Sequence, residues 1–317
     1  LLTENKVNLG FSYANNLGVK KAKGKYICLL NPDTVVPEDF FSRIIKFKES
    51  KNSIGIVGCK MIDGKGNFLP ESKRNLPYTS MVLKRFIGLK NEYYFDNLSK
   101  DEIGGVDVLC GAVMFFEKKD FQKVDGFDEK YFMFGEDIDL SHKLLKQGLK
   151  NYYLGDLSII HYKGESTNKN HKYYKSFYGA MGIYYRKYLA NNILNKLLSY
   201  ITIELIIFFK SFTIASRLNF EKKHKDCYLI SDIIYDGLKN RVSKQINSIQ
   251  KLSDNLENCE IIFDSNHLSY KNIICTMEKF SNNNSVIFKI IPKTANFIIG
   301  SDNSKEHGQV ILFDLNK

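Results

Sequence analysis

Residues 26–33 read Y-I-C-L-L-N-P-D, a short apolar run that ends at Asn31, Pro32 and Asp33. Such a run is typical of a buried strand in an α/β sheet, although periodicity alone does not distinguish it from a buried helix. Open α/β sheets bind their ligands beyond the carboxyl ends of the strands, which is where Asp33 follows. The stretch therefore predicts an α/β sheet with a binding site after this strand.

Further apolar runs and helix signals continue the pattern along the chain. A helix is expected to begin at Pro37, because proline suits a first helical position. Another should follow Gly135, with Leu140, Leu144 and Leu145 on its inner face and Gly148 as its C-terminal stop. Strands alternating with helices predict a layered α/β domain. The other predicted strands are residues 54–58, 107–116, 152–154 and 159–161; residues 119–124 should form a short helix, and 63–105 a long excursion of loop and short helix.

Residues 171–220 are expected to be mostly helical. Within them, residues 197–215 are strongly apolar but contain Glu204 and Lys210. A membrane-spanning helix needs about 20 mostly apolar residues, and charges within it are costly. The segment therefore favours a buried or interfacial helix over a span, and the charged residues 221–225 that follow read as a linker.

The C-terminal third predicts a second, smaller α/β unit. Strand-like runs occur at residues 227–230, 259–263 and 286–291, with helical stretches between them. No G-x-G-x-x-G motif is present, so no ligand is assigned to this unit. It is expected to be a structural or partner-docking module.

The composition of the 317 residues, 44% hydrophobic and 26% charged, is that of a globular protein. The formal charge of +11 suits nucleic acid, an anionic membrane face or phosphorylated substrates as partners, or a merely solvated lysine surface. Nucleic acid is the least favoured, because neither a basic helix interleaved with base-stacking aromatics nor zinc-finger spacing is present. The six cysteines form no C-x-x-C pair and indicate reduced, buried thiols in a cytosolic protein.

Two groups of acidic residues can carry chemistry. Asp33, on a loop after a strand, can hold a hard divalent cation that in turn holds phosphates, although Asn-Pro-Asp is also ordinary turn chemistry. Glu136, Asp137 and Asp139 follow an aromatic run at a helix start. A carboxylate between an apolar wall and a helix N-terminus can act as a general base, or it can simply cap the helix.

Two further features are weaker indications of a binding site. His161 ends a strand beside a glycine-containing loop, where it can bind metal or phosphate or be a structural histidine. Asn8, Gly10 and Asn15 lie in a polar turn that leads into a helix. Their amides can contact a nucleotide, and an ordinary helix cap is the alternative.

Five landmarks in this order resemble the family 2 glycosyltransferases of the GT-A fold, especially the rhamnosyltransferase-like branch that builds bacterial surface polysaccharides. Any one landmark is common, but five at plausible spacing are specific, and the match extends from residue 5 to about residue 190. The landmarks are N-L-G-F-S-Y-A-N-N (8–16), Y-I-C-L-L-N-P-D-T (26–34), V-L-C-G-A-V-M-F-F (108–116), G-F-D-E-K-Y-F-M-F-G-E-D-I-D-L (126–140) and H-Y-K-G-E-S (161–166).

The resemblance implies roles for particular residues. Asp33 matches the last member of a D-x-D-type motif that binds Mg²⁺ or Mn²⁺ and, through the metal, the donor diphosphate; Asn31 stands in the first acidic position. His161 matches a histidine that can complete the metal site. Asp137 matches the catalytic base, with Glu136 beside it. The implied donor- and nucleotide-binding residues are Asn8, Gly10, Asn15, Asn31, Asp33, Gly111 and Ala112.

The resemblance also implies a fold and a domain plan. We expect a GT-A-type (Rossmann-like) mixed sheet flanked by helices, then a helical segment and a small C-terminal α/β unit. The expected parts are a glycosyltransferase domain at 1–190, a helical connector at 191–224 with a membrane-interfacial position as one alternative, and a Rossmann-like unit at 225–317. Family members begin with a strand and a nucleotide-gripping loop that should precede Asn5. Because the chain starts at Leu1 with neither a methionine nor a signal peptide, roughly 60 to 80 residues are expected upstream.

The implied activity is inverting transfer of a sugar from a nucleotide-sugar donor to a saccharide or lipid-linked saccharide, in bacterial surface polysaccharide biosynthesis. The expected location is cytoplasmic, with peripheral contact at the inner face of the plasma membrane as a further option. Two other readings stay open: a sugar nucleotidyltransferase, which would release pyrophosphate, and a non-catalytic scaffold of a polysaccharide assembly complex.

Overall fold

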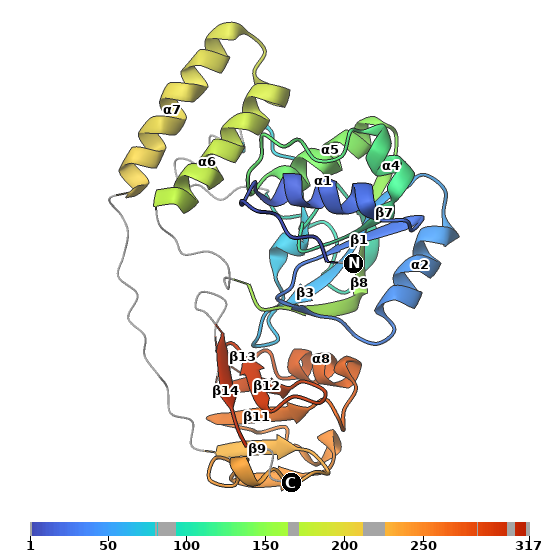
Figure 1. The fold of residues 1–317 in the computed structure, drawn as a ribbon, viewed down its shortest axis with the longest axis vertical. Coiled ribbons are helices and arrows are strands. Elements are labelled where there is room, and N and C mark those ends of the chain that lie inside the picture. Colours follow the sequence, from blue (N-terminus) through green and yellow to red (C-terminus); the bar gives the residue numbers. More distant parts are fainter. Residues whose placement is uncertain are drawn as a thin grey trace.

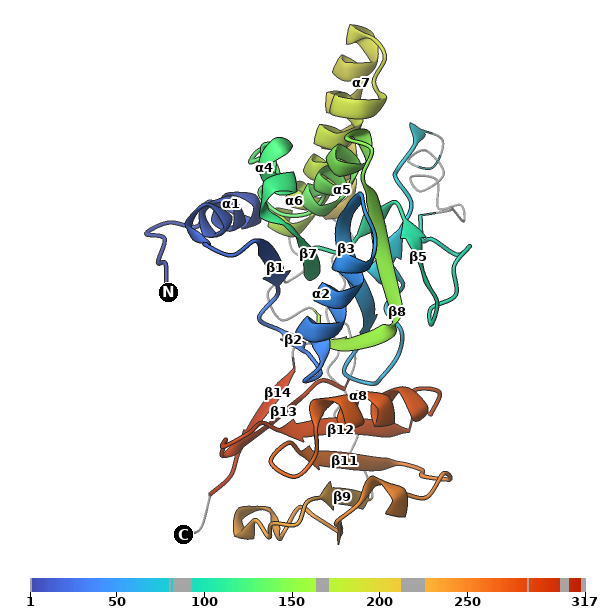
Figure 2. The same cartoon turned by 90° about the vertical axis from the view of Figure 1, so that its right-hand side faces the viewer.

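The chain forms two α/β units and a helical hairpin. The computed structural model describes residues 2–79, 81, 93–163, 171–211, 226–283, 285–302 and 308–314. Figures 1 and 2 show the C-terminal unit at one end of the molecule and the hairpin of α6 and α7 at the opposite end. The N-terminal unit lies between them.

The N-terminal unit is built on a mixed sheet with the strand order β1-β7-β3-β8-β2. Only β3 and β8 are parallel; β7 runs antiparallel to both β1 and β3, and β2 and β5 run antiparallel to β8. All nine residues of β3 are buried, which marks it as the centre of the sheet. The strands are β1 (Tyr26–Leu30), β2 (Thr34–Val35), β3 (Ile54–Ile62), β5 (Ile103–Val106), β7 (Val113–Glu117) and β8 (Lys150–His161).

Helices cover both faces of this sheet. One core contains Ile56 of β3 and Phe116 of β7 packed against α1 (Phe11–Lys21), α4 (Lys118–Lys123) and α5 (Glu136–Lys146). The core on the other face holds α2 (Phe40–Ser50) through Phe40 and Ile44. Apolar side chains alternate between the two faces of a strand, so both faces need a cover. The expected mixed sheet flanked by helices is confirmed.

Three predicted strands differ from the structure. Residues 107–116 form two short strands, β6 (Val108–Leu109) and β7, because the chain turns at Cys110–Ala112; β6 pairs instead with β4 (Lys73–Arg74). The runs 152–154 and 159–161 are one strand, β8. The β3–β8 register jumps from Cys59 opposite Leu154 to Lys60 opposite Ser158, which is a bulge. That bulge is what interrupts the apolar pattern in the sequence.

The helix signals were largely correct. Gly148 lies just after α5 with φ 77°, the left-handed conformation of a helix stop. Pro37 does not begin a helix: its carbonyl closes a turn with the N–H of Phe40, and α2 begins there. Residues 63–105 contain the short η1 (Pro70–Ser72), β4 and the start of β5, while residues 80 and 82–92 lie outside the described part.

The hairpin consists of α6 (His171–Tyr184), a π-helical turn (Tyr185–Leu189) and α7 (Ile193–Ser211). Of the two predicted alternatives, burial applies only to one face of α7, whose buried residues are Ser199, Ile203 and Ile207; an interfacial position stays a prediction. Within the described residues, no helix combines the length and apolar character needed to cross a membrane. The predicted linker at 221–225 lies outside the described residues.

The C-terminal unit has the predicted α/β character. Its sheet has the order β10-β9-β11-β12-β13-β14, parallel from β10 to β12 and antiparallel beyond. Helix α8 (Tyr270–Lys279) packs on one face. The strands are β9 (Asp226–Ile230), β10 (Lys244–Ile246), β11 (Cys259–Asp264), β12 (Val286–Ile291), β13 (Phe297–Gly300) and β14 (Gln309–Leu312), with short 3₁₀ turns at Asp236–Leu238 and Ile249–Lys251. The boundaries 1–190, 191–224 and 225–317 remain predictions.

The two α/β units share an apolar core. Ile62, Ile160 and Tyr162 of the N-terminal unit pack in the same cluster as α8 and the C-terminal sheet. Glu38 accepts hydrogen bonds from the backbone N–H groups of Tyr270 (2.7 Å) and Lys271 (3.2 Å), and so caps α8 from the other unit. The units are therefore packed together rather than merely tethered.

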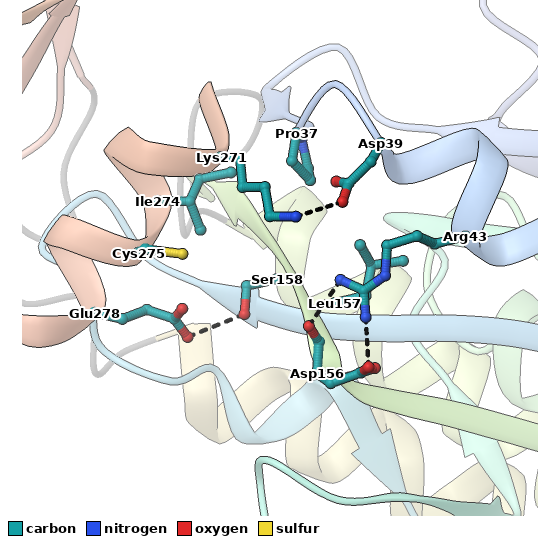
Figure 3. A pocket seen from close by; sticks show the side chains of 10 residues that line it. All are labelled: Pro37, Asp39, Arg43, Asp156, Leu157, Ser158, Lys271, Ile274, Cys275 and Glu278. Carbon is teal, nitrogen blue, oxygen red and sulfur yellow. Dashed lines mark hydrogen bonds and ion pairs between the residues drawn. The ribbon is translucent and has the colours of Figure 1, made fainter. Parts of the chain in front are cut away.

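Polar contacts continue across the same interface. Figure 3 shows a crevice of about 50 Å³ where Lys271 pairs with Asp39 (2.6 Å) and Ser158 donates to Glu278 (3.0 Å). None of the predicted site residues lines this crevice. The thiols of Cys59, Cys227 and Cys259 are buried, as predicted for the cysteines, whereas Cys28 and Cys110 are half-buried and Cys275 beside the crevice is exposed.

Gly66→Ala should destabilise the interface between the units. Gly66 has φ 80°, and an added Cβ would collide with the carbonyl of Met277 in α8. We expect the free energy of unfolding, measured in urea, to fall by about 1–3 kcal/mol. The control Gly18→Ala, in α1 with nothing within 4 Å of the added Cβ, should instead raise it by about 0.5–1 kcal/mol. Equal effects of the two substitutions would contradict this packing.

Candidate active site

The acidic pair Glu136 and Asp137 begins α5 and is held by a tight turn. Phe134 and Gly135 just before it both have positive φ, at 72° and 78°. Such a conformation costs a non-glycine residue about 1–3 kcal/mol. The ring of Phe134 packs edge-on against Tyr173 (5.3 Å between centroids) and Phe177 of α6, which holds the turn in place. The hairpin thus helps to position the two carboxylates.

Asp137 is fixed by a buried arginine. Its Oδ2 accepts hydrogen bonds from Arg74 (2.5 Å) and from the backbone N–H of Gly111 (3.0 Å), and its Oδ1 accepts from the N–H of Ile138 (2.8 Å). Arg74 and Asp137 are 7% and 8% exposed. A charged pair this buried needs additional hydrogen bonds to be tolerated. The guanidinium has them in Tyr93 (2.9 Å) and the carbonyl of Leu109 (3.1 Å).

Arg74 stays charged in this setting. Burial by itself lowers its pKa, but the attraction of Asp137 and the contact with Tyr93 outweigh burial, so the pKa of Arg74 is raised. The cation therefore remains beside Asp137 at any pH where the fold persists. It offsets the negative charge of the acidic pair.

Glu136 has the opposite environment. The pKa of Glu136 is raised well above its usual range, mainly by burial and next by the neighbouring Asp137. Its Oε2 is buried and has no hydrogen-bond partner among the described residues. A Cβ added at Gly111 would lie 3.8 Å from its Oε1, so Glu136 borders this glycine. The pair is thus divided into a carboxylate fixed by Arg74 and a carboxyl group with a free oxygen.

Asp139, the third acidic residue, turns away from the pair. Its Oδ1 accepts from Tyr188 (2.8 Å) and pairs with Lys187 (2.8 Å), both on the π-helical turn, and its side chain is fully buried. Asp139 therefore ties α5 to the hairpin rather than taking part in the chemistry.

Asp33 and His161 are brought together by the sheet. The β2–β8 ladder places Thr34 opposite His161, so that Asp33 Oδ1 and His161 Nε2 are 3.5 Å apart. Burial opposes ionisation of Asp33, but the interaction with His161 and the backbone N–H groups of Asp33 and Lys163 outweigh it and lower the pKa of Asp33. The buried Nδ1 of His161 has no partner among the described residues.

These two side chains fit a divalent metal as a partial ligand set. A carboxylate oxygen and an imidazole nitrogen are donors that Mn²⁺ accepts, and an ionised Asp33 is in the required form. Within the described residues no three His, Cys, Asp or Glu side chains gather as a complete metal site. The remaining ligands would therefore have to come from a bound diphosphate and water.

The two parts of the site are joined through the turn at Cys110–Ala112. The N–H of Asn31 donates to the carbonyl of Ala112 (2.9 Å), while the N–H of Gly111 is held by Asp137. Five of the predicted residues, Asn31, Asp33, Gly111, Ala112 and His161, thus lie around the carboxyl end of β1 and the neighbouring turn. Lys163 is ion-paired with Glu71 beside them.

The three predicted residues near the N-terminus make contacts outside this group of five. Asn8 Oδ1 accepts from the N–H of Gly10 (3.0 Å), and Asn15 donates to the carbonyl of Phe11 (2.9 Å), so both side chains make local bonds. Gly10, with φ 92°, packs against the backbone of Phe132. Asn15 also lines a groove between α1 and β1. Their role in nucleotide binding remains a prediction.

Sequence reasoning missed Arg74, Tyr93 and Phe134. Arg74 lies in the stretch 63–105, which has no periodic signal, and 63 residues separate it from Asp137. No local pattern in the sequence connects the two. Phe134 belonged to the quoted aromatic run, but its positive φ follows from packing against α6 and not from its residue type.

Comparison with known proteins identifies relatives of this chain. Residues 26–219 match the family model described as glycosyl transferase family group 2. The chain is 33% identical over 162 residues to the rhamnosyltransferase WbbL of Escherichia coli K12, covering 48% of this chain and 61% of the relative. It is 30% identical over 195 residues to the minor teichoic acid biosynthesis protein GgaB of Bacillus subtilis 168, covering 60% of this chain and 20% of the relative. The chain thus spans less than two thirds of the length of either relative.

Among solved structures, the mannosyltransferase PcManGT from Pyrobaculum calidifontis, in complex with GDP-Man and Mn²⁺, overlaps with this chain. The TM-score is 0.40 at 14% identity, and the overlap covers 67% of this chain and 55% of that one.

Arg74→Met should destabilise the fold, because it leaves Asp137 buried without its cation. Removing one partner of such a pair costs about 3–5 kcal/mol of unfolding free energy. The double variant Arg74→Met with Asp137→Asn should lose less than the sum of the two single variants, by at least about 1 kcal/mol. Urea unfolding of all four proteins measures this coupling.

The matched control is Arg43→Met, which removes a partly exposed ion pair with Asp156. It should cost at most about 1 kcal/mol. Additive losses in the Arg74 and Asp137 variants would mean that the two side chains do not interact in the folded protein.

Proposed function

The chain belongs to glycosyl transferase family group 2, and on that premise we propose that it transfers a sugar, with inversion, from a nucleotide-sugar donor to a saccharide or lipid-linked saccharide in bacterial surface polysaccharide biosynthesis. The observation that carries the proposal is the placement of Glu136 and Asp137 beside Gly111, on the turn that also contacts the loop of Asp33. The relatives support sugar transfer in surface polysaccharide biosynthesis, since one is named a rhamnosyltransferase and the other a teichoic acid biosynthesis protein.

Asp137 is proposed as the general base that takes the proton of the acceptor hydroxyl. Arg74 and the N–H of Gly111 orient its carboxylate, so its position does not depend on the acceptor. Glu136, with a raised pKa, holds a proton more readily than an ordinary glutamate and lies beside the proposed base. The hydroxyl then attacks the anomeric carbon and the nucleoside diphosphate leaves, with no covalent enzyme intermediate.

Asp33 and His161 are proposed to hold a divalent ion, Mg²⁺ or Mn²⁺. When bound, the ion would neutralise the charge of the departing diphosphate. The lowered pKa of Asp33 keeps its carboxylate ionised at neutral pH, so it is ready to bind a cation. Asn31, Gly111 and Ala112 are proposed to border the donor, and Asn8, Gly10 and Asn15 to reach the nucleotide.

The proposed setting is the cytoplasm, with peripheral contact at the inner face of the plasma membrane. A lipid-linked acceptor would reside in that membrane, and the apolar surface of α7 supports the contact. The C-terminal unit is proposed to brace the donor site, because Ile160 and Tyr162, on either side of His161, pack into its core.

Asp137→Asn in the full-length protein should reduce sugar transfer by roughly 10²- to 10⁴-fold, because the amide cannot take the acceptor proton. The measurement is the release of nucleoside diphosphate in the presence of donor and acceptor, with pyrophosphate followed in parallel. The control Asp254→Asn changes an exposed carboxylate paired with Lys279 in the C-terminal unit and should keep full activity. An unchanged rate in Asp137→Asn would exclude Asp137 as the base, and pyrophosphate release would favour a nucleotidyltransferase.

Asp33→Asn and His161→Ala should each weaken metal-dependent binding of a nucleoside diphosphate by about 10- to 100-fold. Calorimetric titration of the full-length protein with uridine, guanosine and thymidine diphosphates, with Mn²⁺ and then with EDTA, measures the effect without any turnover. Asp156→Asn, beside the crevice between the units, is the control and should bind normally. Diphosphate binding that is unaffected by EDTA would refute the metal site, and no binding at all would favour a scaffold.

A further inference from the structure

Helix α7 has two apolar faces, and within the described part of the chain one of them is packed and the other is exposed. Ser199, Ile203 and Ile207 recur every four residues and are buried. The Cδ1 of Ile203 lies against Gly182 of α6, so this face holds the hairpin together. The spacing of these residues explains the packing on α6, whereas most other apolar residues of α7 are exposed among the described residues.

The second face is exposed and continuous. Nine large apolar or aromatic side chains of α7 are at least half exposed. Besides Tyr200 and Phe208, these are the seven residues Ile193, Leu194, Leu197, Leu198, Ile201, Leu205 and Phe209. At 3.6 residues per turn they fall within one arc of about 160° around the helix, broken only by Glu204. We call these seven residues the apolar arc. Exposed apolar surface of this extent marks an interaction site.

The border of the apolar arc has the chemistry of a lipid interface. Tyr200, beside one edge of the arc, is 55% exposed, and the guanidinium of Arg186 lies 3.9 Å from its ring centre. Lys196 is exposed on the same side, and the chain carries a net charge of +11. Tyrosine, lysine and arginine beside an apolar face suit the headgroup region of an anionic bilayer.

The position of the hairpin also suits a flat surface. It projects at the end of the molecule opposite the C-terminal unit, as both overall views show, so that unit does not obstruct it. Because α6 contacts Phe134 next to the acidic pair, a hairpin lying on a bilayer would bring Glu136 and Asp137 near the lipid headgroups.

We propose that the apolar arc of α7 docks this chain on the surface of an anionic lipid bilayer, with α7 lying in the interface. The inference rests on the peripheral membrane contact in the proposed function and names the surface that makes it. With the arc embedded, α6, which packs on Phe134 beside the acidic pair, lies directly behind α7.

Flotation of the full-length protein with lipid vesicles tests the proposal without any turnover. Vesicles of phosphatidylcholine with one third phosphatidylglycerol should carry the protein upward, and pure phosphatidylcholine should carry less. The arc variant Leu197→Ser, Ile201→Ser and Leu205→Ser should bind the anionic vesicles at least about tenfold more weakly, because three apolar side chains no longer enter the lipid. These positions are exposed, so the variant should fold.

The matched control replaces three exposed apolar residues of the C-terminal unit, as Ile234→Ser, Val310→Ser and Leu312→Ser. It should float like the unaltered protein. Equal flotation of the arc variant, or no flotation of the unaltered protein, would overturn the proposal. Sedimentation equilibrium adds one further outcome. If the unaltered protein does not bind vesicles but self-associates, and the arc variant does not self-associate, the arc binds a second copy of the chain and the proposal is overturned.

Transfer to a soluble acceptor separates this proposal from the proposed function. The arc variant should keep that activity while losing flotation. If the unaltered protein floats but shows no transfer, the docking surface stands and the proposed function fails.

Discussion

One buried arginine fixes the carboxylate on which the proposed chemistry depends. Arg74 reaches Asp137 from β4, in the middle of the long excursion between β3 and β5. The pair is buried, so the fold must position the guanidinium closely or leave a charge without compensation. The carbonyl of Leu109 and the hydroxyl of Tyr93 accept further hydrogen bonds from it, while its buried Nε has no partner among the described residues. The excursion is therefore part of the site and not only a connection.

The same interaction separates the two acidic residues. Arg74 and the N–H of Gly111 bind Asp137, whereas Glu136 lies beside them with its pKa raised by burial and by Asp137. Two neighbouring carboxyl groups with different environments can take different roles in one reaction. Here the difference is created by a residue that lies 63 positions away in the sequence.

The elements around the sheet support this site from both ends of the molecule. At one end, α6 packs on Phe134 and the π-helical turn binds Asp139, which together hold the start of α5. At the other end, the C-terminal unit packs against Ile160 and Tyr162, and Glu38 caps its helix α8. The region around His161 and the start of α5 are thus each packed against a part of the chain that carries none of the predicted catalytic residues.

The sequence by itself determined the sheet, its strand-end loops and the residue types of the site. Apolar runs such as residues 26–30 and 54–58 predicted strands, since burial on both faces requires them to be apolar, and Gly148 predicted the end of α5. It also placed Asp33 after a strand, His161 at the end of a strand and Glu136–Asp137 at the start of a helix, because these signals are local. Only the tertiary structure decided that Arg74 pairs with Asp137, that residues 150–161 are one bulged strand, and that most of α7 is exposed. Those outcomes depend on contacts between residues far apart in the chain, which no local pattern of polarity or turn residues encodes.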